Sequence, residues 1–373
     1  MATYITTQQA LDMVQSGDYI ITGLGAAEAR AFLSELHTIA DRVKDVMVTN
    51  CLPMGAYEFM VNPAYKDSFR TESWFYTPAL RKAQPNGNVS FIPNHLHLSC
   101  YKRLCYRKPD IYVGICSMPD KHGYVSLSVS NTYEKEIIGN AKTVILECNP
   151  NAPRTFGDVQ IHSTDIDYLV NVDYPLPELA DTEPNEKDRI IGKYIADMIK
   201  DGDCLQLGIG GIPNAVADSL MDKKDLGIHT ELLTTGMVKL IKAGVVNNRR
   251  KNLLPGKTVA VMAMGTRELY DFVDDNPAER EQVRTALPGM PVPELATPEH
   301  YARVLDRSGY FEVTTFSKDD RSRNRMYKEN VQRAAAQLQF ADYADYLRSL
   351  EMTAQITPFA PEFLARTTQL INK

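Results

Sequence analysis

The 373 residues are enough for two domains with separate hydrophobic cores, and contents of 44% hydrophobic and 24% charged residues are ordinary for a globular chain. The net charge of −6 excludes the broad basic surface of a nucleic-acid-binding protein, and no apolar run approaches the ~20 residues that a membrane helix needs. Six cysteines without a C-x-x-C pair, and an N-terminus without a signal-peptide pattern, favour a reduced, cytoplasmic protein.

The N-terminal half alternates between patterns typical of helices and of strands. Helices are expected at 6–16 and 26–39. Strands are expected at 19–22, 46–49, 89–92, 111–117 and 143–148. Because helix-length segments separate most of these strands, the chain predicts an α/β fold with an open, mainly parallel sheet covered on both faces.

Residues 149–184 interrupt this alternation with many prolines and polar residues. A helix expected at 188–200 follows, so we place a domain boundary near 183–187. The pattern predicts two related α/β lobes and a C-terminal segment, with bounds 1–183, 187–276 and 277–373.

The second lobe begins with a glycine-rich loop between a strand and a helix. A short strand ends at 205–207, Gly208, Gly210 and Gly211 follow, and Pro213 opens an apolar-periodic helix. Glycines let a ligand approach the backbone closely. Free N–H groups at the start of a helix favour an anion or a developing oxyanion.

A second strand, loop and helix follow directly. The strand is expected at 227–233, the tripeptide TTG lies at 234–236, and the helix is expected at 237–243. Glu231 lies near the C-terminal end of this strand, where ligands usually bind in an open α/β sheet.

The string LGIGGIPNAV at 207–216, followed by IHTE at 228–231, resembles the acetyl-CoA hydrolase/transferase family, in particular 4-hydroxybutyrate and butyrate-type CoA-transferases. The resemblance implies that Glu231 is the covalent nucleophile. The chain departs from the family at 234–236, where TTG stands in place of the common Ser-Asp-Gly. The remaining matching strings lie in the first lobe, namely FIP with His97, PDKHGY at 119–124 and PRTFGD at 153–158 with the following IH and DID.

The resemblance, which extends from residue 1 to about 276, implies a reaction. Attack of Glu231 on an acyl-CoA gives a mixed anhydride, the thiolate returns to give a glutamyl-CoA thioester, and a second small carboxylic acid takes up the CoA without ATP. Gly208, Gly210, Gly211 and Ile212 are the expected substrate- and CoA-binding residues. We expect no permanently bound cofactor and a homo-oligomer. Interception of the acyl-enzyme by water would make the same site a hydrolase.

Other candidate residues have simpler interpretations. His97, His122 and His162 lack metal-ligand spacing and are expected to be structural. Arg154 could pair with Asp158 or Asp165. No metal site is expected.

The end of the chain follows a different pattern. A strand at 259–265 and a helix at 266–276 still resemble the CoA-transferases, but the strand pair and glycine-rich stretches that complete the family's catalytic lobe do not follow. Residues 272–280 instead resemble an acidic motif of FkbH-like proteins in the haloacid-dehalogenase superfamily, and the likeness continues to 373. Helices at 325–339 and 342–351 dominate this segment, which we do not expect to complete the CoA site.

The change from one family resemblance to another near residues 272–280 predicts a fusion of two sequences, and it leaves an alternative function open. The Asp-x-Asp-x-Thr motif of dehalogenases is absent, and the similar string at 201–205 lies between a helix and a strand, at the wrong strand end. The alternative to a CoA-transferase is therefore a catalytically incomplete remnant with a tail that serves only packing or partner contacts.

Overall fold

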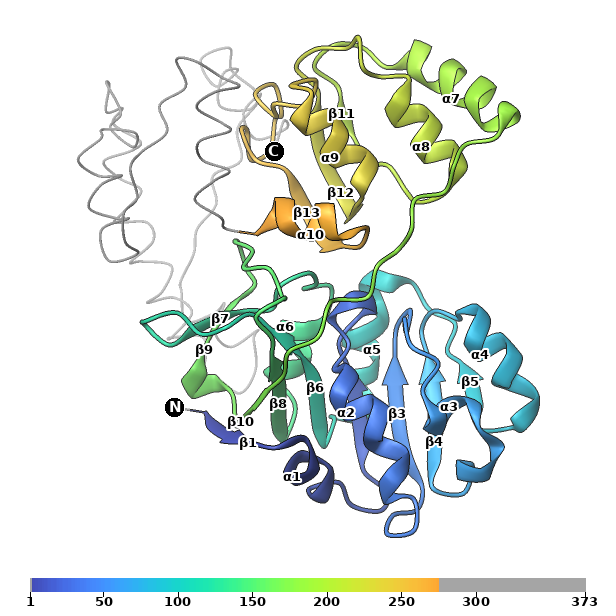
Figure 1. Ribbon diagram of the computed structural model, residues 1–373, viewed down its shortest axis with the longest axis vertical. Helices are drawn as coiled ribbons and strands as arrows, with labels where there is room; N and C mark the ends of the chain where they lie inside the picture. Colours follow the sequence, from blue (N-terminus) through green and yellow to red (C-terminus); the bar gives the residue numbers. More distant parts are fainter. Residues whose placement is uncertain (1, 275–373) are drawn as a thin grey trace, which may run out of the picture. The chain divides into compact units, whose positions relative to one another are not determined.

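An eight-stranded parallel sheet organises the first lobe of the computed structural model, which describes residues 2–274 (Figure 1). The strand order is β1-β10-β8-β6-β2-β3-β4-β5, and every neighbouring pair is parallel. The strands are β1 (Thr3–Ile5), β2 (Tyr19–Thr22), β3 (Val46–Asn50), β4 (Phe69–Ser73), β5 (Val89–Phe91), β6 (Ile111–Cys116), β8 (Thr143–Cys148) and β10 (Tyr168–Asn171). The predicted open, parallel α/β sheet is confirmed.

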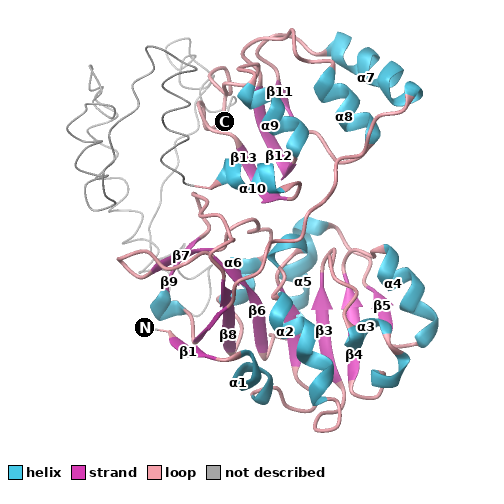
Figure 2. Cartoon of the chain, in the orientation of Figure 1, coloured by secondary structure: helices cyan, strands magenta, loops and turns pink. Residues whose placement is uncertain are grey.

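The central strands are buried on both faces. Every residue of β2 and β6 is buried, as expected for strands covered by helices on each side. Successive side chains point to opposite faces, so Tyr19 and Ile21 enter one hydrophobic core and Ile20 enters the other. Figure 2 shows α2 lying across one face of these strands.

The helices of this lobe are short. They are α1 (Thr7–Asp12), α2 (Arg30–Glu35), α3 (Glu58–Val61), α4 (Pro78–Ala83), α5 (Ser99–Tyr106) and α6 (Glu134–Ile138). A capping box starts α1, because Thr6 Oγ1 accepts from the Gln9 N–H and Gln9 Oε1 accepts from the Thr6 N–H.

The single helix predicted at 26–39 is wrong, because the chain breaks into three pieces there. The 3₁₀ turns Gly25–Ala27 and Leu36–Ile39 flank α2, and Glu28 is extended with ψ 143°. The helix restarts because the buried carboxylate of Glu147, on β8, accepts the N–H groups of Ala31 at 3.2 Å and Phe32 at 2.7 Å. This carboxylate takes the place of a local N-cap.

The segment 149–184 contains more structure than its prolines indicated. It carries β10 of the large sheet and β9 (Gln160–His162), which pairs antiparallel with β7 (Tyr124–Ser126). The rise in proline content marks the end of the lobe only after Asn171.

The second sheet has three parallel strands in the order β11-β12-β13. Its elements are α7 (Glu186–Met198), β11 (Cys204–Leu205), α8 (Gly211–Asp218), β12 (Gly227–Leu233), α9 (Thr235–Lys242), β13 (Val259–Ala263) and α10 (Arg267–Val273). The predicted bounds of β12 are confirmed, whereas β11 ends two residues earlier than predicted.

Two glycines allow close contacts around α7. A Cβ on Gly192 would lie 2.7 Å from the backbone carbon of Ala215 on α8, and one on Gly211 would lie 2.2 Å from Asp188 Oδ2. Figure 1 shows α7 and α8 side by side in the second lobe. Helix packing therefore requires Gly192, whose Cβ would meet backbone atoms, whereas the Asp188 side chain could shift away from a side chain at position 211.

The described residues all lie within one compact unit of the chain. None of their helices is long and apolar enough to cross a membrane. The predictions made for 277–373, including the helices at 325–339 and 342–351 and the FkbH-like resemblance, lie outside the described residues. The lobe boundary at 183–187 stays a prediction.

Candidate functional site

Glu231 lies in a pocket of about 380 Å³ that both lobes line. On β12, Thr230 and Leu232 are buried whereas His229 and Glu231 are exposed, as the two-residue period of a strand requires. Glu231 is the only acidic residue among those that line this pocket. The lining residues are Leu24, Cys51, Leu52, Trp74, Phe75, Asn94, Leu96, Gln206, Leu207, Gly208, Ile209, Glu231, Leu232, Met262 and Met264.

The walls from the first lobe come from loops that follow four neighbouring strands. Leu24 follows β2, Cys51 follows β3, Trp74 follows β4, and Asn94 and Leu96 come soon after β5. Because β2, β3, β4 and β5 are adjacent and parallel, their carboxyl ends meet at one edge of the sheet. This edge is where open α/β sheets usually bind ligands.

The second lobe approaches the pocket through the same kind of edge. Residues 206–209 follow β11, Glu231 lies near the end of β12, and Met264 follows β13. The carboxyl ends of both sheets thus contribute to one site.

The predicted glycine loop is divided between two hollows. Gly208 lines the pocket of Glu231, and Gly210 lines a neighbouring hollow of about 110 Å³ with Thr234 and Thr235. Gly210 has φ 111° and ψ −178°, a conformation essentially restricted to glycine, and nothing lies within 4 Å of a Cβ placed there. Gly211 and Ile212 line neither of these hollows. Gly211 instead contacts Asp188, so the binding role of these two residues stays a prediction.

Cys51 is an apolar wall of the pocket rather than a reactive thiol. Burial, followed by the negative charges of Glu134 and Glu231, raises the pKa of its thiol to about 12. The thiol is therefore protonated at neutral pH, and only a thiolate attacks a carbonyl efficiently.

The loop after β3 is fixed by a buried carboxylate. Glu28 accepts the N–H groups of Met54 and Gly55, each at 3.1 Å, and burial raises its pKa to about 7. Leu52, in the same loop, has a positive φ of 54°, which is uncommon for a non-glycine residue. Such strained positions persist where their surroundings hold them, and they occur often at functional sites.

Comparisons with known proteins agree with this arrangement. Residues 2–177 match the family model of the acetyl-CoA hydrolase/transferase N-terminal domain. RipA from Yersinia pestis has 33% sequence identity and a TM-score of 0.70, and the similarity covers 74% of this chain and 67% of RipA. The chain belongs to the acetyl-CoA hydrolase/transferase family.

Curated relatives carry names from the same family. The chain is 38% identical over 269 residues to a succinyl-CoA:cyclohexane-1-carboxylate CoA transferase of Geobacter metallireducens, covering 72% of the chain and 61% of the relative. It is 37% identical over 277 residues to a 4-hydroxybutyrate coenzyme A transferase of Clostridium kluyveri, covering 73% of the chain and 64% of the relative. The chain thus spans less than two thirds of the length of these two curated relatives.

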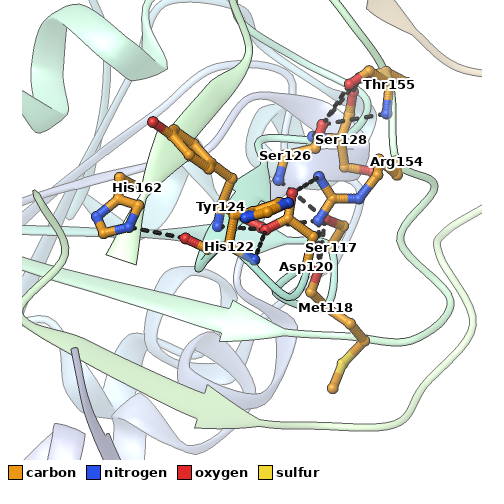
Figure 3. Close-up of polar contacts among 10 residues, drawn as sticks. All are labelled: Ser117, Met118, Asp120, His122, Tyr124, Ser126, Ser128, Arg154, Thr155 and His162. Atoms are coloured by element: carbon orange, nitrogen blue, oxygen red, sulfur yellow. Dashed lines mark hydrogen bonds and ion pairs between the residues drawn. The ribbon is translucent and has the colours of Figure 1, made fainter. Parts of the chain in front are cut away.

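Arg154, in one of the strings that resemble the acetyl-CoA hydrolase/transferase family, organises a network of turns (Figure 3). Its Nη2 donates to the carbonyl oxygens of Met118 and Tyr124, both at 2.9 Å, and its Nη1 lies 3.7 Å from Asp120 Oδ2. The expected pairing with Asp158 or Asp165 is therefore wrong. Arg154 instead fixes the turn that leads into β7.

Other residues complete this network. Asp158 forms its ion pair with Lys135. Thr155 Oγ1 donates to the carbonyl oxygen of Ser128 at 2.6 Å, and the Thr155 N–H donates to Ser126 Oγ at 3.2 Å. The string PRTFGD at 153–158 thus packs against the serine-rich strand that follows the string PDKHGY at 119–124.

The three histidines occupy structural or peripheral positions. His162 donates from Nε2 to the carbonyl oxygen of His122 at 3.1 Å, and its Nδ1 accepts from Thr164 Oγ1 at 2.8 Å (Figure 3). His97 stacks against His95 at a centroid distance of 5.6 Å. Within residues 2–274, no group of three or more His, Cys, Asp or Glu side chains could hold a metal ion.

Sequence patterns singled out Glu231, which the structure places in the pocket, but they missed the pocket walls. Trp74 is 6% exposed and contacts Tyr133 edge-on at 5.0 Å, and neither residue belongs to a recognised motif. The sequence feature that could have predicted these walls is their position, because each wall residue of the first lobe lies shortly after a strand of the parallel sheet.

Proposed function

We propose that the chain transfers CoA from an acyl-CoA to a small carboxylic acid, with Glu231 as the nucleophile. The observation that carries this proposal is the position of Glu231, the only carboxylate among the described residues that line an apolar pocket at the carboxyl ends of both sheets. The CoA-transferase names of the relatives support the same reaction class.

The chemistry follows from a carboxylate held against a thioester. A Glu231 oxygen forms a bond to the thioester carbon, the carbon–sulfur bond breaks, and CoA leaves as a thiolate. The thiolate then attacks the glutamyl carbonyl of the mixed anhydride, which releases the first acid and forms a glutamyl-CoA thioester. A second acid repeats both steps in reverse and regenerates the Glu231 carboxylate. No ATP or permanently bound cofactor is required.

The surroundings of Glu231 favour this reaction. Walls such as Leu24, Trp74 and Met264 are apolar, so an acyl group bound against them would displace water from the neighbourhood of the attacking carboxylate. The Gly208 side of the pocket presents backbone close to Glu231, so its N–H groups are candidates to stabilise the tetrahedral oxyanion.

Trapping the glutamyl-CoA thioester tests the nucleophile. The full chain is incubated with butyryl-CoA and reduced with borohydride, which converts a glutamyl thioester into a primary alcohol that mass spectrometry locates. We expect the label on Glu231. Glu231→Gln should abolish labelling and transfer, and Glu231→Asp should lose about 100-fold because its carboxylate is displaced. Glu186→Gln, an exposed glutamate outside the pocket, is the matched control.

Other outcomes of this experiment are equally informative. Wild-type turnover by Glu231→Gln would exclude a covalent role for Glu231. A folded chain that neither transfers CoA nor becomes labelled would support the non-catalytic alternative. The FkbH-like nature of 277–373, a homo-oligomeric state and a cytoplasmic location all remain predictions.

A further inference from the structure

The walls around Glu231 carry information about the acyl group. Apart from Glu231 and Gly208, every described residue that lines the pocket has an uncharged side chain, and most of these side chains are apolar, such as Leu24, Trp74 and Met264. Among the described residues that line this pocket, none is Lys, Arg or His. The only other polar side chains in the lining belong to Asn94 and Gln206.

We infer that the site selects acyl groups that are neutral and apolar beyond the thioester, and that it discriminates against acyl groups with a second carboxylate. This inference rests on the proposed CoA-transferase function and names its substrate class. An unpaired carboxylate in such a pocket loses its hydration without gaining a cationic partner. The negative charge of Glu231 would repel it as well.

The volume of the pocket bears on the size of the acyl group. A pocket of about 380 Å³ is larger than an acetyl group needs. A longer acyl group, straight or cyclic, therefore buries more apolar surface there than acetyl does.

Trp74 provides a reporter of pocket occupancy. It is the only tryptophan in the chain, it is 6% exposed, and it lines the same pocket as Glu231. A ligand that replaces water against the indole ring changes its fluorescence, so binding can be measured without turnover.

The test is a titration of the full chain with CoA and with acetyl-, butyryl-, hexanoyl-, cyclohexanecarbonyl- and succinyl-CoA, followed by Trp74 fluorescence. We expect affinity to rise about fourfold for each added CH₂ from acetyl to hexanoyl, because each one buries apolar surface. Succinyl-CoA should bind no more tightly than acetyl-CoA. Equal affinity for succinyl-CoA and butyryl-CoA would overturn the inference, as would affinities independent of chain length or no response to any acyl-CoA.

Two phenylalanines with similar exposed fractions allow a controlled test of the charge argument. Phe75 lines the pocket and is 55% exposed, whereas Phe91 is 51% exposed and lies outside it. Phe75→Arg should strengthen succinyl-CoA binding about threefold, as expected for a partly exposed ion pair, and weaken hexanoyl-CoA binding. Phe91→Arg should leave the affinities for the acyl-CoA series unchanged. The same gain with Phe91→Arg would show that general charge, not the pocket, determines selectivity.

Failure of the inference can be distinguished from failure of the proposed function. Glu231→Gln should bind the acyl-CoA series in the same order while losing transfer. If the order holds but borohydride never labels Glu231, the pocket selectivity stands and the covalent mechanism fails. If Glu231 is labelled equally well from succinyl-CoA and butyryl-CoA, the mechanism stands and the selectivity fails.

Discussion

Glu28 couples the stability of the pocket loop to pH. Its side chain is 1% exposed, and its carboxylate accepts the N–H groups of Met54 and Gly55, in the loop that carries Cys51 and Leu52 to the pocket. Burial raises its pKa from 4.5 to about 7, and the hydrogen bonds oppose this rise only in part. The folded chain therefore binds this proton more tightly than the unfolded chain.

The sign and magnitude of the effect follow from this difference. The contribution of Glu28 to the free energy of unfolding is fully present below pH 4.5 and is lost as the pH rises through about 7. Between pH 5 and pH 8 the loss is about 2–3 kcal/mol. In Glu28→Gln the side chain is neutral at every pH and one amide oxygen can still accept a backbone N–H. Relative to the wild type, this variant should therefore gain about 2–3 kcal/mol on going from pH 5 to pH 8.

Urea unfolding at pH 5 and pH 8, followed by Trp74 fluorescence, measures this change. Glu147→Gln is the matched control, because Glu147 is also buried with a pKa raised to about 7 but caps α2 instead of holding the pocket loop. In both variants the free energy of unfolding should depend less on pH than in the wild type. Only Glu28→Gln should alter acyl-CoA affinity. If Glu28→Gln keeps the wild-type difference between the two pH values, the reasoning from burial is refuted.

Two glycine substitutions test the packing and the loop. Gly192→Ala should destabilise the chain by about 1–3 kcal/mol in urea unfolding, because its Cβ would meet backbone atoms of Ala215 at under 3 Å. Gly139→Ala, where the nearest atom is 3.6 Å away, should be neutral, and equal losses would contradict the packing argument. Gly210→Ala and Gly157→Ala impose similar strain at φ 111° and 104°, about 1–3 kcal/mol each. Only Gly210→Ala should slow CoA transfer, by about tenfold or more. Equal turnover by Gly210→Ala and Gly157→Ala would show that the loop with Gly210 is not part of the site.

The strands that sequence predicted best have both a strong apolar pattern and clear end signals. The bounds of β2, β8 and β12 match the prediction, because apolar, largely β-branched runs lie between turn residues or prolines. Strand β4 was missed because its sequence, FRTES, alternates Phe69, Thr71 and Ser73 on the buried face with Arg70 and Glu72. Its buried side is mostly hydroxyl-bearing, so local hydrophobicity does not reveal it.

The helix breaks were hidden for a different reason. Nothing near residue 28 in the sequence marks the interruption before α2, since alanines and charged residues there favour a helix. The interruption depends on Glu147, more than a hundred residues away, and on the backbone of the loop that Glu28 binds. Tertiary hydrogen bonds thus overrode local propensity.

At the candidate site, too, local sequence patterns predicted only part of the arrangement. Glu231 could be singled out as a candidate because the glycine loop and the strand that carries Glu231 are close in sequence and resemble a family string. The pocket walls required the order of β2, β3, β4 and β5 in the sheet, which no local pattern contains. The positions of Gly211 and Ile212 outside both hollows likewise depend on how α7 packs against α8.

The division of the pocket between two lobes separates selectivity from chemistry. The second lobe supplies Glu231, the loop with Gly208 and the walls Met262 and Met264, whereas the first lobe supplies only walls for the acyl group in our proposal, such as Leu24, Cys51 and Trp74. First-lobe loops at the ends of parallel strands can change without disturbing the sheet, because the ladder hydrogen bonds lie upstream of them. Changes of acyl preference should therefore arise in these loops at little cost in stability. Changes around Glu231 should alter the transfer step itself, since α8 and α9 pack directly against the strand that carries it.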